Sequence, residues 1–226
     1  MANPNDSGSR RRALGTLISA PLALLGLGVA ARAAAATAPA TDELAQKIDA
    51  LAAGQAIADA HIQIKRVLNL YARGWDRRDE EALRSCFWPD STHEHGGFKG
   101  KSSDFIGGGL KGTASVLAMT HIITNETIDL KGDRAVCECY FLAHHRRPRT
   151  DDGEGLEDMF IKGRYLDRFE RRDGLWKIAH RHGLSDYSTI NRPASSLLDK
   201  TPAEQLSGKK PDDPLYAMLA SLGTEA

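Results

Sequence analysis

Two side chains in the sequence, Asp76 and His121, are of types that catalyse proton transfer. Asp76 follows several large apolar residues of a helical pattern, the last of which is Trp75, so its carboxylate is set at the edge of an apolar environment, which suits a general base. Met119 and Ile123 share the strand face of His121, so the imidazole should point into an apolar pocket. A histidine is a competent base near pH 7 only when a neighbouring carboxylate fixes its tautomer and stabilises its charged form.

Other interpretations of these and neighbouring residues are open. Asp76 could cap the segment that follows it, and His121 could be a hydrogen-bonded core histidine. The pairs His93–His95 and His180–His182 suggest a metal-dependent enzyme, because alternate residues of a strand share a face and two adjacent strands could bind zinc, copper or iron. The adjacent pair His144–His145 points to opposite faces and cannot join one site.

Residues 1–38 have the pattern of an export signal. Ser9-Arg10-Arg11-Arg12 resembles the twin-arginine motif, an uncharged stretch rich in Leu and Ala follows, and residues 33–40 offer cleavage sites of the Ala-x-Ala type. We therefore expect export to the periplasm by the twin-arginine route, with no stable membrane association after signal removal. The alternative is an uncleaved membrane anchor.

The charge balance argues against a nucleic-acid-binding protein, and the cysteine content argues against a protein with a disulfide framework. Residues 1–36 contain four arginines and one acid, so their removal leaves a net charge of −3, and no basic surface for nucleic acid is expected. Cys137 and Cys139 would share one strand face at a spacing that suits a disulfide poorly. Together with Cys86 they are predicted to be core thiols, so no disulfide framework is indicated.

Helices are predicted before strands along the chain. Apolar residues at spacings of three, four and seven predict a core helix over 56–73, preceded by a separate N-terminal arm at 39–55. Residues 79–87 should form a short helix with Asp79 as its N-cap. Residues 102–118 fit either a helix weakened by three consecutive glycines or a loop that orders over a ligand.

The second half of the chain has the alternation of long antiparallel strands. A strand at 91–95 turns at two glycines, two long hairpins follow, and residues 191–226 form a proline-containing C-terminal arm. Helices followed by such strands predict an α+β fold with the helices on one face of the sheet. The hairpins pair 120–130 with 134–145 and 159–170 with 176–185.

Four short motifs occur in a fixed order between residues 56 and 190. They are Tyr71-x4-Asp76, Thr120-His121-x3-Asn125, Gly132-Asp133-Arg134-Ala135, and Arg171-Arg172-Asp173-Gly174-Leu175-Trp176-Lys177-Ile178. With this order the chain resembles the SnoaL-like branch of the nuclear transport factor 2-like superfamily, and its pattern is most similar to the γ-hexachlorocyclohexane dehydrochlorinases and bile acid 7α-dehydratases. The resemblance implies a cone-shaped roll, in which a curved antiparallel sheet wraps round the N-terminal helices and a pocket opens at one end.

The resemblance also implies a reaction: β-elimination of the dehydratase type, or an allied isomerisation, without a cofactor, on a small hydrophobic cyclic substrate. His121 would remove a proton from carbon and Asp76 would orient it. Arg181 matches an arginine that stabilises the departing anion. Tyr71 would donate a hydrogen bond to a hydroxyl or carbonyl oxygen, which favours dehydration over loss of halide.

Substrate contacts and assembly follow from the same resemblance. The predicted walls of the substrate pocket are Trp75, Tyr140, Tyr165 and Met119, and a homotrimer or homodimer is expected. On the same fold, the chain could instead be a non-catalytic ligand-binding or subunit protein. Arg181 could equally be an ordinary partner in an ion pair.

Overall fold

The computed structural model of the protein describes residues 25–151, 153–193, 201–202 and 205–222. The chain divides into two units, residues 1–53 and 54–226. Residues 1–24 of the predicted export signal lie outside the described residues. None of the helices within the described ranges combines the length and the apolar character needed to cross a membrane.

The first helix, α1 (Leu25–Asp76), is longer than the sequence predicts. We expected an arm at 39–55 to be separated from the core helix at Gly54, but the helix continues through this residue. One glycine inside a helix costs only about 1 kcal/mol relative to alanine, which the helix-forming residues on either side outweigh.

Two short helices follow. In α2 (Glu80–Ser85) the Asp79 side chain accepts a hydrogen bond from the backbone N–H of Ala82 at 3.1 Å, which confirms the predicted N-cap. The ambiguous region forms a helix, α3 (Ser102–Gly112), despite its glycines. Gly109 is needed there, because a Cβ at this position would lie 2.5 Å from the Trp75 ring. The absence of a side chain lets α3 approach α1 closely.

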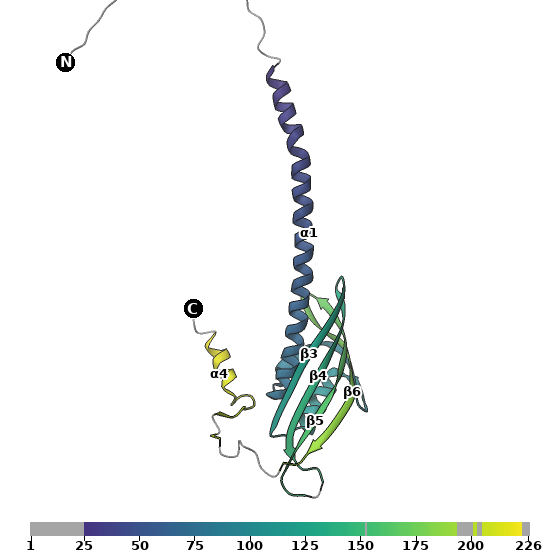
Figure 1. The fold of residues 1–226 in the computed structure, drawn as a ribbon, viewed down its shortest axis with the longest axis vertical. Coiled ribbons are helices and arrows are strands. Elements are labelled where there is room, and N and C mark those ends of the chain that lie inside the picture. The colour runs from purple at the N-terminus through teal and green to yellow at the C-terminus, as the bar shows by residue number, and fades with distance from the viewer. Residues whose placement is uncertain (1–24, 152, 194–200, 203–204, 223–226) are drawn as a thin grey trace, which may run out of the picture. The chain divides into compact units, whose positions relative to one another are not determined.

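Six strands form one sheet in the order β2-β1-β6-β5-β4-β3. The second half of the sheet, β3 to β6, consists of the two predicted hairpins side by side (Figure 1). These findings confirm the α+β class, with one difference: β1 pairs with β6 in parallel, whereas every other pair is antiparallel. The strands are β1 (Phe87–His95), β2 (Phe98–Lys101), β3 (Ala118–Lys131), β4 (Arg134–Pro148), β5 (Leu156–Arg172) and β6 (Leu175–Asn191).

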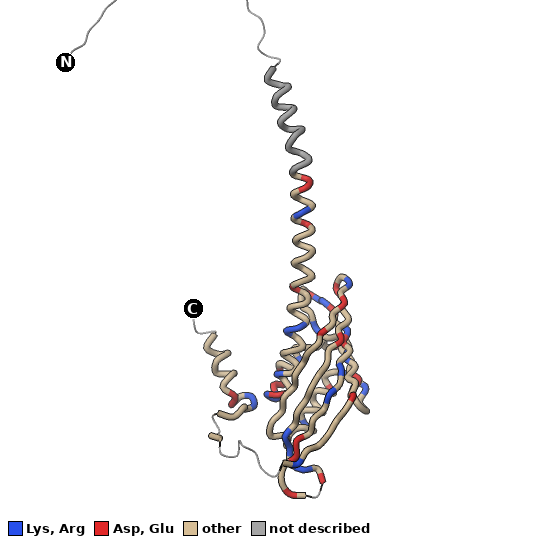
Figure 2. The backbone as a smooth tube through the Cα atoms, in the orientation of Figure 1, with Lys and Arg blue, Asp and Glu red and all other residues tan. Residues whose placement is uncertain are grey.

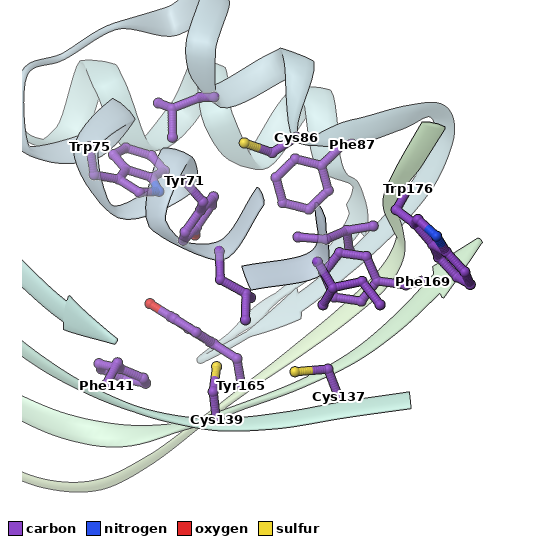
Figure 3. Packing of buried hydrophobic residues seen from close by; sticks show 14 of the residues in the cluster. Tyr71, Trp75, Cys86, Phe87, Cys137, Cys139, Phe141, Tyr165, Phe169 and Trp176 are labelled. Carbon is purple, nitrogen blue, oxygen red and sulfur yellow. The ribbon is translucent and has the colours of Figure 1, made fainter. Parts of the chain in front are cut away.

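The core lies between the sheet and the helical segments that follow residue 53. Figure 3 shows Tyr71 and Trp75 on the helical side, facing Phe141 and Tyr165 on the strands. The three cysteines are free and buried, as predicted for core thiols. The other face of the sheet is exposed and partly apolar.

Two features of the surface bear on function. Figure 2 shows Lys and Arg intermixed with Asp and Glu over the part of the chain that the structure describes, with no extended region of one sign. The C-terminal segment includes α4 (Pro214–Ser221), and the backbone N–H of Lys210 donates to the carbonyl oxygen of Arg77 at 2.8 Å. This contact brings the predicted C-terminal arm to the end of α1.

Candidate active site

Asp76 and His121 meet through two hydrogen bonds. The Asp76 Oδ1 atom lies 2.7 Å from Nδ1 of His121, and Oδ2 accepts from the backbone N–H of His121 at 3.1 Å. An ionised carboxylate only accepts hydrogen bonds, so in the neutral imidazole Nδ1 carries the proton and Nε2 has a free lone pair. Only about a tenth of each side chain is exposed, 14% for Asp76 and 10% for His121. The pair therefore has the geometry of a carboxylate-oriented base.

The end of α1 places Asp76 in this position. Arg78 has a left-handed backbone with φ of 53°, and the backbone N–H groups of Arg78 and Asp79 donate to the carbonyls of Trp75 and Gly74. This arrangement is a Schellman motif, which ends a helix abruptly. The Arg78 guanidinium also donates to the carbonyl oxygens of Leu110 and Thr113 at 2.8 and 2.7 Å, so the helix end is tied to α3.

His121 faces a cavity of about 210 Å³ between the helices and the sheet. This volume is below the range of about 300–1,000 Å³ that is usual for drug-sized ligands, so the cavity suits a small one. No Lys, Arg, Asp or Glu is found among the described residues that line it. The lining is mainly aromatic and aliphatic, and consists of Tyr71, Trp75, His95, Phe105, Gly109, Thr113, Met119, His121, Phe141, Ala143, His145, Ile161, Tyr165 and Ser185.

Tyr71 lines the same cavity, whereas Asp76 does not. The Tyr71 ring meets Trp75 and Tyr165 edge to face, with ring centroids 6.1 and 5.8 Å apart. Burial raises the pKa of Tyr71 above its ordinary value, although the nearby charge of Arg181 opposes the shift. The phenol is therefore protonated at neutral pH and can donate a hydrogen bond.

Arg181 has a different position from the one expected. Its side chain is fully buried, does not line the cavity, and makes two hydrogen bonds to Asp167, at 2.7 and 2.6 Å. The guanidinium lies 4.1 Å from the ring centres of both Tyr71 and Tyr165. Its charge is balanced by Asp167, so the structure supports the ion-pair interpretation and places Arg181 behind the tyrosines instead of against a ligand.

Of the four residues predicted to line the substrate pocket, three do so and one does not. Trp75, Tyr165 and Met119 line the cavity. Tyr140 does not: it is 42% exposed, because Cys139 and Phe141 on either side of it point inward and strand residues alternate between faces. The prediction for Tyr140 is therefore wrong.

Several cavity residues escaped the sequence interpretation. The sequence suggests His95 only as a metal ligand and indicates no place in the cavity for His145, Phe105 or Phe141. Strand alternation could have identified His145, since its position in the sequence differs by even numbers from those of the buried Cys137 and Cys139 and all three share one face. Asp167 could not have been found as the partner of Arg181 without the register of β5 and β6.

The two His-x-His pairs do not form one site. In the parallel pairing of β1 and β6, His93 lies opposite Arg181, so His93 and His95 share the inner face with that arginine. His180 and His182 are on the other face by alternation. Within the described parts of the chain, no group of three or more His, Cys, Asp or Glu residues has the arrangement of a metal site.

Comparisons with known structures agree with this architecture. A hexachlorocyclohexane dehydrochlorinase of type 3 from Novosphingobium barchaimii is 21% identical, with a TM-score of 0.54 over 64% of this chain and 98% of that chain. A protein from Novosphingobium aromaticivorans, provisionally assigned as a scytalone dehydratase, is 22% identical, with a TM-score of 0.54 over 63% of this chain and 95% of that one. At these identities the likeness concerns the fold. A comparison with curated proteins found no match.

Sequence comparison identifies the family directly. The model of the SnoaL-like domain matches residues 56–182, from the core part of α1 into β6. This range is more than half of the chain and contains Asp76, His121 and all but one of the residues that line the cavity. The protein therefore belongs to the family of SnoaL-like domains.

Proposed function

We propose that the protein is a lyase that catalyses β-elimination of the dehydratase type, or an allied isomerisation, on a small hydrophobic cyclic substrate and without a cofactor. The observation that supports this is the Asp76–His121 pair at 2.7 Å, set beside an apolar cavity. A structural core histidine needs no carboxylate that holds both its ring and its backbone N–H. A base that must receive protons from carbon does need a fixed tautomer and a stabilised cation.

The proposed reaction begins at Nε2 of His121. This atom accepts a proton from a substrate carbon next to an electron-withdrawing group, and the C–H electron pair forms the new C=C bond while the C–O bond on the neighbouring carbon breaks. The hydroxyl leaves with the C–O bonding pair, takes the proton from the imidazolium and departs as water. Asp76 stabilises the imidazolium while it exists. In an isomerisation the proton returns to a different carbon.

Tyr71 has the second role in this proposal. Its protonated hydroxyl would donate a hydrogen bond to the carbonyl or leaving oxygen, where negative charge develops. Arg181 would act indirectly, by holding the rings of Tyr71 and Tyr165 through its two contacts of 4.1 Å. We therefore assign Arg181 a positioning role and no contact with substrate.

A turnover screen with matched variants tests the proposal. Hydroxylated carbonyl compounds and halogenated rings would be incubated with the wild type, His121→Ala, Asp76→Asn and His144→Ala, and loss of water or hydrogen halide followed by mass spectrometry. General base catalysis contributes about 10²–10⁴-fold, so His121→Ala should lower kcat by that factor. His144 is the control, because it adjoins the site in sequence but faces outward and lies 2.9 Å from Asp158.

The outcomes separate the functional classes. Equal turnover by the wild type and His121→Ala would exclude His121 as the base. Binding of ring compounds without turnover of any of them would assign the protein to the non-catalytic ligand-binding class.

We also propose that the chain assembles as a homotrimer or homodimer through the outer face of the sheet. Ile122, Leu142, Phe160 and Tyr187 are 42–56% exposed there and line one shallow hollow. Apolar side chains grouped in this way on a surface are typical of protein interfaces. Export to the periplasm by the twin-arginine route is likewise a proposal, since it rests on residues 1–38 of the sequence.

A further inference from the structure

One part of α1 carries large apolar side chains that are open to solvent. In the first unit, Leu44, Ile48 and Leu51 are 58%, 55% and 74% exposed. All of residues 41–59 are exposed, on every side of the helix. Most of the stability of a helix in a protein comes from packing of its apolar face, so this exposure indicates a missing partner.

The apolar residues have the spacing of a coiled coil. Leu44, Ile48 and Leu51 are four and three residues apart, which is the alternation of positions a and d in a heptad repeat. The alternation continues in the sequence as far as Ile62. The seam defined in this way has Ile48, Gln55 and Ile62 at its a positions and Leu44, Leu51 and Ala58 at its d positions. Isoleucine at a with leucine at d favours a parallel pair of helices.

The polar residue of the seam, Gln55, distinguishes parallel from antiparallel pairing. In a parallel pair in register, the two copies of Gln55 face each other and can exchange a hydrogen bond, while aliphatic residues face aliphatic residues. In an antiparallel pair that aligns the whole seam, Gln55 faces Leu51, which offers no hydrogen bond to the buried amide. A single polar residue at an a position is a known way of fixing the register of a coiled coil.

The residues beside the seam allow two copies to approach. Two of the flanking positions hold the small residues Ala52 and Gly54, and two hold the charged residues Lys47 and Asp59. In a parallel pair, Lys47 lies next to Ala52 of the second copy and Asp59 lies next to Gly54, so neither meets a like charge. The ammonium of Lys47 is already paired within its own helix, 2.7 Å from Glu43.

We propose that two copies of this chain pair through the seam as a parallel two-stranded coiled coil. Residues 44–62 correspond to about 28 Å of helix. The seam ends there because the next d position holds Lys65, whose ammonium lies 3.8 Å from Glu126 of β3. This is short for a coiled coil, so the pair would reinforce the contact proposed for the outer face of the sheet, and it favours a homodimer over a homotrimer. The inference does not depend on the proposed elimination.

Disulfide cross-linking tests the parallel register. The three native cysteines are buried, so a cysteine introduced on the exposed helix can be followed by itself. Under mild oxidation of the purified full chain, Ile48→Cys should yield a linked dimer, because identical seam positions face each other. Ala53→Cys is the control, since position 53 is exposed on the helix face away from the seam, and it should give at least about ten-fold less dimer. Antiparallel pairing would separate the cysteines of Ile48→Cys by about 15 Å along the helix axis.

Sedimentation over a range of protein concentrations measures the strength of the pair. Leu51→Glu should weaken self-association by at least about 100-fold, because one leucine side chain from each copy loses its burial. Ala53→Glu, on the face away from the seam, should weaken it by less than about 3-fold. Position 51 is 74% exposed in the single chain, so the substitution should leave the fold intact.

Three results would overturn the inference: a monomeric wild type, equal cross-linking of Ile48→Cys and Ala53→Cys, and equal self-association of Leu51→Glu and Ala53→Glu. If Leu142→Lys lowers the mass while Leu51→Glu does not, the sheet face alone assembles the chain and the coiled coil is refuted. Turnover is a separate measurement. Loss of the dimer in Leu51→Glu would support the coiled coil even if no substrate of the proposed elimination were found.

Discussion

Breaking the buried Arg181–Asp167 ion pair should lower the free energy of unfolding by an amount that can be derived from the structure. Both side chains have an exposed fraction of zero, and their two hydrogen bonds of 2.7 and 2.6 Å satisfy both carboxylate oxygens. In the variant Asp167→Asn, an amide nitrogen that cannot accept a hydrogen bond replaces one of these oxygens, and the negative charge is lost. The substitution therefore leaves a cation without compensation in the core.

The expected cost is large because the guanidinium cannot lose its proton. Although burial alone would lower it, the charge and hydrogen bonds of Asp167 hold the pKa of Arg181 well above its ordinary value. Removing one partner of a buried pair costs about 3–5 kcal/mol. For a protein of this size, that free energy corresponds to a decrease in Tm of about 6–20 °C.

Thermal and chemical denaturation would measure the loss. The matched control is Asp90→Asn, which breaks the Arg172–Asp90 pair at 2.8 Å, where the side chains are 36% and 66% exposed. Solvent screens that pair, so Tm should hardly change. Replacing both buried partners, by Arg181→Met with Asp167→Leu, should recover most of the stability. If Asp167→Asn costs no more than Asp90→Asn, then the core does not isolate the guanidinium from water and the reasoning fails.

Three further predictions concern acid stability, assembly and export. Burial lowers the pKa of His93 from 6.5 to about 2. Below about pH 6.5 only the unfolded chain therefore binds this proton. As the pH decreases further, the free energy of unfolding should decrease by up to about 1.4 kcal/mol per pH unit. In His93→Phe, the free energy of unfolding measured with urea should depend less on pH between about pH 6 and about pH 4 than in the wild type. The same dependence on pH in both proteins would contradict the assignment. Leu142→Lys on the outer face should lower the mass found by light scattering; a monomeric wild type would refute assembly. Arg10→Lys with Arg11→Lys should leave the uncleaved chain in the cytoplasm on cell fractionation, whereas normal export would exclude the twin-arginine route.

The sequence was sufficient for features that depend on local pattern. The position of Asp76 at a helix end and the inward direction of His121 follow from helical spacing and strand alternation, and both are present in the structure. Features that depend on register were not accessible. The parallel pairing of β1 with β6 places the two His-x-His pairs on opposite faces of the sheet. The register of β5 and β6 pairs Asp167 with Arg181, so the arginine that was expected to bind an anion is part of a buried ion pair.

That change in Arg181 also bears on the leaving group. With Arg181 balanced by Asp167, and with no Lys or Arg among the described residues that line the cavity, no fixed cation is placed to meet a departing anion. The nearest positive charge in the proposed reaction is the proton that His121 has just taken. A hydroxyl can accept that proton and leave as neutral water, whereas chloride is too weak a base to do so and would leave two separate ions, the imidazolium and the halide, among apolar walls. If the proposed elimination takes place in this cavity, its electrostatics would therefore favour dehydration over dehalogenation, independently of the tyrosine at position 71.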